Sequence, residues 1–518
     1  MSQPPVPGPA AGLPPGLPPG VEPFPWRRLD PRMLLVHPVL ELLKFLPVLV
    51  GIFVLGSSGG GGYWQLIGVG IPVALGVVRF LTTTYRITPE QIELQRGLIG
   101  RKVLTARLDR VRAVEVTSSP IHRILGLAKV EIGTASGAKD DDDKFALDGL
   151  PLEQARQMRV ALLHRTDPRP SSDAVAGATG SDDVPDEDLV LLEFDRRWVR
   201  YAPLTSSGNV IAAGVMAVLG QFSQNIGERL FDEVDAFSWI KDRPLGTVIP
   251  IAVVSLLVVF LVLGGLFSVL GYLITNWGFT LLRDARGRTF HVRRGLLTTT
   301  ETSLERERVR GLEVVEPLGL RLVGAARLAA IVTGVKASES GSAQLVPPAP
   351  REVIDATGAA VIDVAEPLRL PLVQHGPAAR RRRYTRALLG AAAPPAVAVV
   401  LALATPADWW VVLPTLALFP IALLLARDRY RRLGHALSDA YLVVRSGSLR
   451  GRRDLLQRSG IIGWNLHQSW FQRRAGLVTL VATTAAGRQA YAAHDIPEGL
   501  AVHLADEAVP GLITQFLA

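Results

Sequence analysis

Residues 118–132 read SSPIHRILGLAKVEI, and the frame around this stretch occurs three times in the chain. Two glycines bracket each copy with the same separation of 29 residues, and an arginine stands three residues before the second glycine. The three sets are Gly97, Arg123 and Gly126; Gly295, Arg321 and Gly324; and Gly447, Arg473 and Gly476. The segments DRVRAVEV (109–116) and ERVRGLEV (307–314) keep the same register. This spacing predicts three copies of one structural unit.

Each copy has the pattern of several short strands followed by one helix. The segments AVEVTS (113–118) and KVEIGTAS (129–136) alternate apolar and polar residues with period two, which is typical of half-buried strands. After the strands, LEQARQMRVALLHR (152–165) and PEGLAVHLADEAVPGLI (497–513) place apolar residues at helical spacing. Each copy is therefore predicted to be a small curved antiparallel sheet closed by a C-terminal helix.

The composition indicates a membrane protein. Of 518 residues, 48% are apolar and 20% charged, and the mean hydropathy is +0.27. The chain contains no cysteine, which excludes disulfides and every metal, redox or nucleophilic site that needs a thiol. The net charge of +9 fits either nucleic acid or an anionic membrane surface, and only the positions of the charges can distinguish these two partners.

Six stretches approach the length of about 20 apolar residues that spans a bilayer. They form three close pairs: 38–55 with 64–81, 209–222 with 247–274, and 387–404 with 409–426. Short or neutral-to-acidic loops join the members of each pair, so each pair is predicted to be a transmembrane helical hairpin. The stretch 248–274 carries no charge, whereas 209–222 is the shortest of the six.

Arginines cluster outside the hairpins and predict their orientation. The clusters are Arg27, Arg28 and Arg32, then Arg79 and Arg86, around the first hairpin; Arg196, Arg197 and Arg200, then Arg283, Arg286 and Arg288, around the second; and RRRRYTR (380–386), then RDRYRR (427–432), around the third. Both termini and all long hydrophilic segments are therefore expected to be cytoplasmic. A polybasic run could also bind nucleic acid or lipid headgroups, but its position beside the membrane favours topology signalling.

The quoted segments resemble a known family. ITPEQIELQRGLIGRK (87–102), DRVRAVEV (109–116), SSPIHRILGLAKVEIGTAS (118–136) and LDGLPLEQARQMRVALL (147–163) resemble the bacterial pleckstrin-homology-like (PH-like) domain of YdbS/YdbT-type membrane proteins. The third copy is the most diverged, with QSWFQRRAGLVTLVATTA (468–485) as its best segment. Three hairpin-plus-domain units resemble the larger, three-domain YdbT-like member. The resemblance implies a membrane-anchored adaptor and a smaller one-domain partner.

The expected fold class is an α+β multi-pass membrane protein in which three transmembrane hairpins alternate with three cytoplasmic PH-like domains. The boundaries are 1–25, a disordered Pro-rich tail; 26–82, hairpin 1; 83–165, domain 1; 166–190, an acidic linker; 191–276, hairpin 2; 277–365, domain 2; 366–426, hairpin 3; and 427–518, domain 3.

The three repeated arginines, Arg123, Arg321 and Arg473, are the candidate site residues. As a binding set they would contact an anion, either a lipid phosphate or a carboxylate of a partner protein. As a structural set they would brace the fold by donating to backbone carbonyls. The structural interpretation is favoured, because three positions keep the arginine although their surroundings differ. The six repeated glycines are expected to permit tight turns.

No pattern indicates an enzyme. No histidine and carboxylate pair has metal-ligand spacing and no phosphate-binding GxxxxGK occurs, so neither a cofactor nor a metal is expected. The glycine-rich GSSGGGG (56–62) is interpreted as a connector, and KDDDDK (139–144) as a solvated loop rather than a cation site. Glu41 and Lys44, near a membrane boundary, are interpreted as a local pair.

The sequence thus predicts a non-enzymatic scaffold or adaptor in the bacterial plasma membrane, with envelope maintenance as one candidate process. Three copies favour multivalent binding to protein or lipid headgroups. Expected partners are membrane lipids and a smaller one-PH-domain membrane protein, with no nucleic acid. Gly264 and Ser268 form a small-xxx-small pattern that favours either helix docking or internal packing. The alternative is a transporter or lipid-handling protein, whose polar path would have only Glu41, Lys44, Gln221, Gln224 and Asn225.

Overall fold

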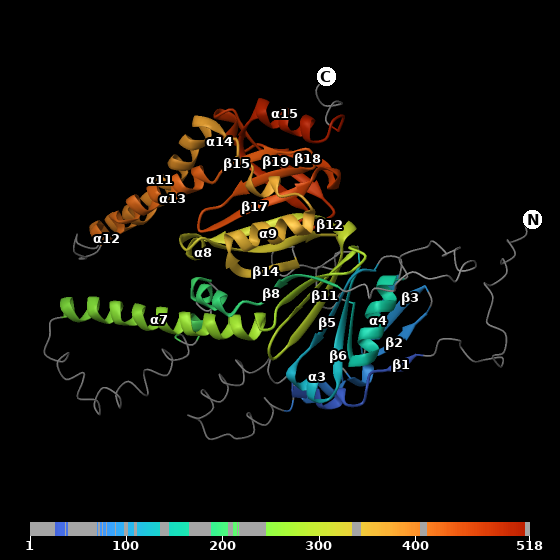
Figure 1. Ribbon diagram of the computed structural model, residues 1–518. Helices are drawn as coiled ribbons and strands as arrows, with labels where there is room; N and C mark the ends of the chain where they lie inside the picture. Colours follow the sequence, from blue (N-terminus) through green and yellow to red (C-terminus); the bar gives the residue numbers. More distant parts are fainter. Residues whose placement is uncertain are drawn as a thin grey trace, which may run out of the picture. The chain divides into compact units, whose positions relative to one another are not determined.

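The computed structural model describes residues 26–36, 38–39, 70, 73–74, 76–78, 80–88, 90–97, 102–107, 111–134, 145–164, 188–205, 211–214, 216, 245–333, 343–404 and 412–512. The chain divides into two compact units, Met1–Thr179 and Gly180–Ala518, and each is treated by itself. The first unit contains repeat 1, and the second contains repeats 2 and 3 (Figure 1).

Repeat 1 consists of two antiparallel sheets and two helices. The first sheet has the order β1 (Arg27–Arg28), β2 (Thr84–Ile87), β3 (Gln91–Arg96) and β4 (Lys102–Arg107). The second pairs β5 (Val111–Ser118) with β6 (Leu127–Thr134) and β6 with β7 (Phe145–Pro151). The short helix α3 (Pro120–Ile124) joins β5 to β6, and α4 (Leu152–His164) follows β7. The inward positions of the alternating strands, among them Ile92, Leu94, Val114 and Val130, form one buried core.

Repeat 2 has the same plan, preceded by a long helix. The strand β8 (Leu189–Glu193), the 3₁₀ helix η3 (Arg196–Leu204) and α7 (Leu245–Asn276) lead into β9 (Thr280–Arg283), β10 (Thr289–Arg294) and β11 (Thr299–Glu305). The turn η5 (Arg306–Arg308) then redirects the chain into the second set of strands, which are β12 (Val309–Pro317), β13 (Ala325–Val332) and β14 (Ala343–Pro350). The helices α8 (Leu318–Leu322), α9 (Arg351–Ile362) and α10 (Glu366–Arg369) complete the repeat.

Repeat 3 follows a helical hairpin. The helices α11 (Gly376–Ala404), α12 (Val412–Leu416) and α13 (Leu418–Arg431) precede β15 (Gly434–Leu437), β16 (Tyr441–Ser446) and β17 (Arg450–Gln457). The turn η7 (Arg458–Gly460) leads to β18 (Ile461–His467), β19 (Leu477–Thr484) and β20 (Ala490–Pro497), with α14 (Trp470–Arg474) between β18 and β19 and α15 (Glu498–Ala508) at the end. Each repeat therefore has two sheets rather than the single curved sheet expected, and in repeats 2 and 3 the turns η5 and η7 reorient the chain between them.

The six repeated glycines all have positive φ, from 62° at Gly476 to 112° at Gly295. At Gly295 a Cβ would lie 1.9 Å from the carbonyl oxygen of Thr298, so a side chain would collide with the turn that joins β10 to β11. Left-handed backbone favours glycine at all six positions, and lack of space adds to this at Gly295 and Gly447.

Repeats 2 and 3 share one sheet. Strand β12 of repeat 2 pairs antiparallel with β17 of repeat 3, from Gly311 opposite Leu456 to Pro317 opposite Arg450. Among the described residues the sheet has the order β14–β13–β12–β17–β16–β15, with α9 lying against the strands of repeat 2 (Figure 1). A Cβ at Gly311 would lie 1.9 Å from the carbonyl oxygen of Leu455, so glycine permits the close approach of β17.

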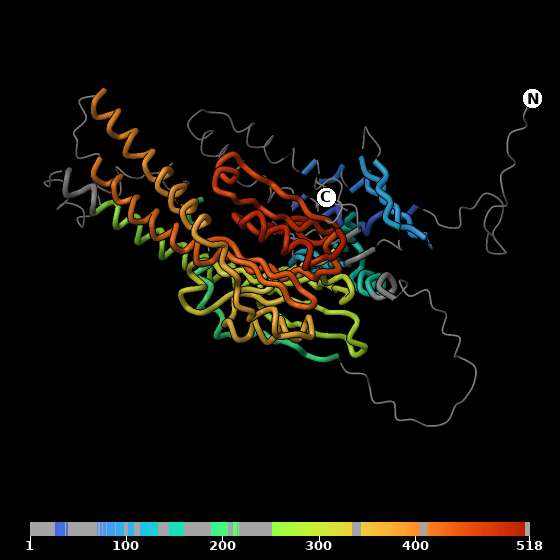
Figure 2. The backbone as a smooth tube through the Cα atoms, turned by 90° about the horizontal axis from the view of Figure 1, so that it is seen from above, coloured from blue at the N-terminus to red at the C-terminus, as the bar shows by residue number. Residues whose placement is uncertain are grey.

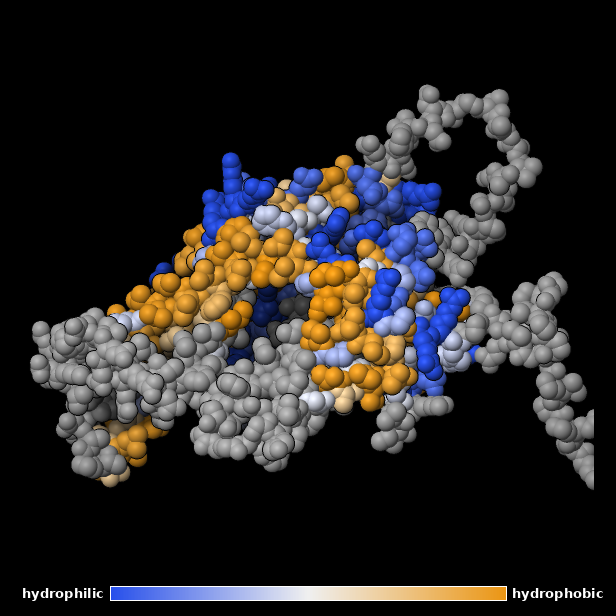
Figure 3. All heavy atoms as spheres, turned by 90° about the horizontal axis from the view of Figure 1, so that it is seen from below, coloured by the Kyte–Doolittle hydropathy of each residue, from blue (hydrophilic) through white to orange (hydrophobic). Residues whose placement is uncertain are grey.

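Two helices in the described part of the chain are long and apolar enough to cross a membrane. They are Ile251–Asn276 within α7 and Gly376–Ala404, which is α11. Large apolar side chains along both are exposed, including Val262 at 64% and Leu403 at 72%, and the space-filling view shows broad apolar surface (Figure 3). Helices α11 and α13 lie side by side as a hairpin (Figure 2). Most of the first predicted hairpin and most of 209–222 lie outside the described residues, so three hairpins remain a prediction.

Candidate anion-binding pocket between repeats 2 and 3

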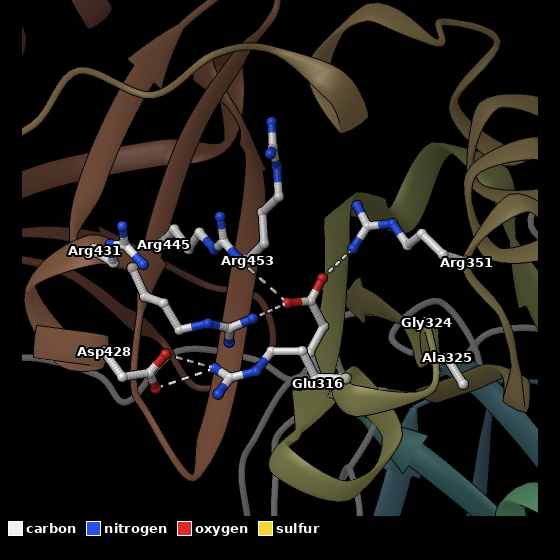
Figure 4. Close-up of a pocket in the computed structure, with 10 residues that line it drawn as sticks. Glu316, Gly324, Ala325, Arg351, Asp428, Arg431, Arg445 and Arg453 are labelled. Atoms are coloured by element: carbon white, nitrogen blue, oxygen red, sulfur yellow. Dashed lines mark hydrogen bonds and ion pairs between the residues drawn. The ribbon is translucent and has the colours of Figure 1, made fainter. Parts of the chain in front are cut away.

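A pocket of about 550 Å³ opens where β12 ends and β17 begins, in the second unit of the chain. This volume is typical of small-ligand sites. Its lining comes from β12, α8, the start of β13, the start of α9, the end of α13, β16 and β17. The lining residues are Glu316, Arg321, Gly324, Ala325, Arg351, Asp428, Arg431, Arg432, Arg445 and Arg453 (Figure 4).

Glu316 lies at the centre and contacts three arginines (Figure 4). It forms ion pairs with Arg351 at the start of α9, with Arg432 Nη2 at 2.5 Å, and with Arg445 Nη2 at 3.5 Å. Burial raises the pKa of Glu316, but the positive charges of Arg351, Arg432 and Arg445 outweigh that effect and hold its pKa below the ordinary value. Glu316 is therefore a permanent negative charge that three cations share.

A second ion pair connects repeat 2 to the helical hairpin that precedes repeat 3. Arg321 on α8 lies 3.0 Å from Asp428 on α13. Arg321 is one of the three predicted arginines, and this contact brings the stretch that defines the repeat onto the pocket wall. The sequence predicted either an anion contact outside the chain or a hydrogen bond to a backbone carbonyl. It did not predict an ion pair with a carboxylate of the hairpin.

Arg453 and Arg432 are the most buried cations of the pocket, at 8% and 4% exposure. Arg453 Nη2 donates to the carbonyl oxygens of Pro367 and Leu370 at 3.0 and 2.9 Å. Burial first, and then the charges of Arg351 and Arg445, lower the pKa of Arg453 to about 10. Within the described structure, Nε of Arg453 and Nη1 of Arg432 are buried and have no hydrogen-bond partner. Both guanidinium groups thus retain a buried donor without a partner, Nε in Arg453 and, in Arg432, an Nη1 that packs on β17.

Gly451 on β17 makes room for Arg432. A Cβ at Gly451 would lie 1.4 Å from Arg432 Nη1 and 2.7 Å from its Cζ. The guanidinium of Arg432 therefore packs directly on the backbone of the strand. Any larger residue at position 451 would displace Arg432 from Glu316.

The charge of the lining is unbalanced. Six arginines line the pocket, whereas only Glu316 and Asp428 supply negative charge. Guanidinium groups present planar forks of donors that match the oxygens of carboxylates and phosphates. The excess of cations and the unused donors suit a site for an anionic group. Among the described residues, no cluster of three or more His, Asp or Glu could hold a metal ion.

The structure separates the three predicted arginines. Arg321 lines the pocket, whereas Arg123 on α3 and Arg473 on α14 are exposed. The residue before the arginine makes the buried contacts in repeats 1 and 3. His122 Nε2 lies 3.0 Å from Asp148 Oδ1, and Gln472 Nε2 donates to Asp495 Oδ1 at 2.9 Å. The sequence shows that a polar residue precedes the arginine in repeats 1 and 3. It does not show the carboxylate partners, because these lie on the later strands β7 and β20.

Part of the polybasic run makes intramolecular ion pairs. Arg382 and Arg383 at the start of α11 both contact Asp495 of β20, a side chain that is 1% exposed, and Arg383 Nη2 lies 2.7 Å from Asp495 Oδ2.

The small residues predicted for helix docking lie in α7. Gly264 and Ser268 are buried, and Ser268 Oγ donates to the carbonyl of Thr205 at 3.3 Å. Ser268 therefore packs within the chain, against the segment after η3.

Comparison with known proteins identifies the repeats. The model of the family described as Bacterial PH domain matches residues 39–166, 233–370 and 378–507, well over half of the chain. The chain belongs to the bacterial PH domain family. Each matched region contains one repeat, so the repeats are three bacterial PH domains joined to apolar helices. The pocket lies between the second and third of these PH domains.

The chain is also similar to a membrane protein of Bacillus subtilis (strain 168), the UPF0699 transmembrane protein YdbT. The two are 20% identical over 311 residues, which cover 58% of this chain and 60% of YdbT. The match thus spans less than two thirds of the length of YdbT. No solved structure matches the chain. The resemblance to YdbT-like PH-domain proteins predicted from the sequence is confirmed.

Proposed function

We propose that the protein is a non-enzymatic membrane scaffold whose second and third PH domains together bind a phosphate group at the cytoplasmic membrane surface. The observation that carries this proposal is the imbalance of the pocket, where six arginines face two carboxylates. The buried Nε of Arg453, which has no hydrogen-bond partner among the described residues, would gain one on such an anion. Phosphate is favoured over a carboxylate because it offers more acceptor oxygens to several forks at once.

The position of the pocket suits a phosphate group that is supplied at the membrane surface. Arg431 and Arg432, which line it, stand at the end of α13, the second helix of the third hairpin. Only about five residues of helix separate Ala426, the end of the predicted span, from Arg431, which corresponds to roughly 8 Å along the helix axis. A lipid headgroup and a soluble phosphate share the required chemistry. Binding by PH domains on both sides of the pocket would make the pair of domains one recognition unit.

The first test is phosphate binding by the full-length protein in detergent at constant ionic strength. Inorganic phosphate should raise the thermal stability of the protein in a saturable way. Arg431→Gln should weaken binding by about tenfold or more, because a charge-assisted hydrogen bond contributes about 1.5–3 kcal/mol. Isothermal titration calorimetry measures the same difference directly.

The control is Arg293→Gln. Arg293 lies on β10, away from the pocket lining, and its side chain is 63% exposed, so this change removes the same charge without touching the site. Nanodiscs with anionic lipid, compared with zwitterionic ones, distinguish the two sources: a headgroup in the pocket would suppress phosphate binding. Equal phosphate affinity in wild type, Arg431→Gln and Arg293→Gln would reject the proposed site.

A further inference from the structure

The junction between repeats 2 and 3 shows how one repeat covers an edge of the next. Strand β12 is the first strand of the second sheet in repeat 2, and β17 is the last strand of the first sheet in repeat 3. Their pairing buries Glu313 and Val314 completely. Gly311 allows the β17 backbone to come within contact distance.

Strand β18 occupies the place of β12 in repeat 3. It has the same register with β19 that β12 has with β13, including the irregularity before Gly311, which recurs before Gly463. In the described part of the chain, no strand pairs with the outer edge of β18. Two of its apolar residues are accordingly exposed: Ile462 is 65% and Leu466 47% exposed. Leu466 holds the position of the fully buried Val314.

Strand β4 occupies the place of β17 in repeat 1. Its register with β3, from Gln91 opposite Arg107 to Arg96 opposite Lys102, is that of β16 with β17. Strand β4 is the last strand of its sheet, so its outer edge also has no partner strand among the described residues. Val103 on this strand is 51% exposed. The chain therefore carries both halves of the junction in uncovered form.

Transferring the observed register brings the exposed residues together. In the β12–β17 junction Val314 lies opposite Arg453. The corresponding residues are Leu466 on β18 and Val103 on β4. The pairing of β18 with β4 would thus place two exposed apolar side chains opposite each other, and such cross-strand pairs stabilise a sheet.

The β18–β4 pairing would carry fewer charges than the observed β12–β17 junction. Glu313 on β12 lies 3.5 Å from Arg452 and faces a β17 strand that also carries Arg453. On β18 the place of Glu313 is taken by the neutral Asn465. On β4 the place of Arg452 is taken by Lys102, and the places of Arg453 and Asp454 are taken by Val103 and Leu104. In the transferred register Asn465 lies opposite Leu104, where Glu313 lies opposite Asp454 in the observed junction. A neutral residue therefore faces a neutral residue, and this match favours β4 as the partner of β18.

We propose that β18 of one chain pairs antiparallel with β4 of a second copy of the chain, so that copies join head to tail. Main-chain hydrogen bonds along two open edges supply affinity, and the Leu466–Val103 contact fixes the register. The contact uses two different surfaces, so it is heterologous and extends into a row of copies unless it closes into a ring. This inference deepens the scaffold function and does not depend on the anion pocket.

The test uses the absence of cysteine in the natural chain. Leu466→Cys is made in one tagged full-length chain and Val103→Cys in a chain with a different tag, and both are expressed in the same cells. Each chain then has a single thiol, so a disulfide between the two tags can form only between chains. Facing residues of an antiparallel pair lie at distances that disulfides accept, and mild oxidation should produce the mixed dimer on a non-reducing gel.

The matched control pairs Ile462→Cys with Val103→Cys. Ile462 is more exposed than Leu466 but lies four residues away on the same strand, about 13 Å, so little mixed dimer should form. Leu466→Lys should reduce the assemblies seen by native mass spectrometry to single chains, whereas Ile462→Lys should leave more of them intact. Equal crosslinking from both positions, crosslinking of Leu466→Cys only to a different protein, or single chains in the wild type would each overturn the proposal.

Discussion

His375 and His435 form a buried pair beside the third hairpin. His375 Nε2 and His435 Nδ1 lie 3.0 Å apart, and His375 Nδ1 lies 2.8 Å from the carbonyl oxygen of His494. Burial, with a smaller contribution from His375, lowers the pKa of His435 to about 4. Burial also lowers the pKa of His375, although its contact with His494 opposes the shift. The pair is therefore neutral at pH 7.

This pair predicts a loss of stability in mild acid. The pKa of His435 is lower in the folded chain than its ordinary value of 6.5, so the unfolded chain binds more protons between about pH 6.5 and 4. Stability is full above pH 6.5 and falls toward pH 4, by on the order of 3 kcal/mol. Thermal unfolding should show this decline in wild type. His435→Gln should reduce it and the exposed-site control His503→Gln should not; identical pH profiles for all three would contradict this account.

Residues differ in how much of their role the sequence reveals. The six glycines are visible from spacing alone, because each turn is a local feature within one repeat. Arg432 and Gly451 are not visible, because the guanidinium packs on a strand that becomes its neighbour only after folding. Glu316 likewise collects arginines from α9, the end of α13 and β16, segments that are distant in sequence. No spacing rule connects such residues.

At the scale of elements, Asp495 ties the first helix of the third hairpin to the PH domain that follows it. Its carboxylate contacts Arg382 and Arg383 of α11 and accepts from Gln472 of α14. The side chain is 1% exposed. Burial lowers the pKa of Arg383, and the charge of Asp495 opposes that shift. The run of arginines thus has a structural role in addition to the predicted topology signal.

Removing the charge of Asp495 should destabilise the protein strongly. Asp495→Asn leaves two arginines without their anion, and breaking a buried pair costs about 3–5 kcal/mol. Asp495 has a φ of 55°, a conformation that asparagine also tolerates, so the substitution isolates the charge. The melting temperature of the purified protein measures the effect, and the exposed Asp439→Asn is the control. A melting temperature unchanged by Asp495→Asn would show that the tie does not hold α11 in place.

The strands and C-terminal helices could be predicted from periodicity, because each buries one face against its own repeat. The short helices α3, α8 and α14 could not, since five residues contain too little pattern to distinguish a helix from a loop. The pairing of β12 with β17 was also invisible, because edge pairing depends on backbone groups that every sequence offers. Only Gly311, a glycine inside a strand, hinted at a close neighbour.

The whole molecule is a membrane protein with three bacterial PH domains. The family match and the two apolar helices support membrane anchoring of these domains. The arginine clusters predict that every PH domain lies in the cytoplasm. Phosphate binding between domains and head-to-tail joining of copies both require the domains to share that side of the membrane.

The most direct test of this arrangement is labelling of single cysteines in intact cells with a maleimide that cannot cross the membrane. Ser58→Cys, in the predicted loop of the first hairpin, should react from outside. Gly137→Cys, in the first PH domain, should react only after the membrane is permeabilised. Labelling of Gly137→Cys in intact cells, with Ser58→Cys protected, would contradict the cytoplasmic display of the PH domains.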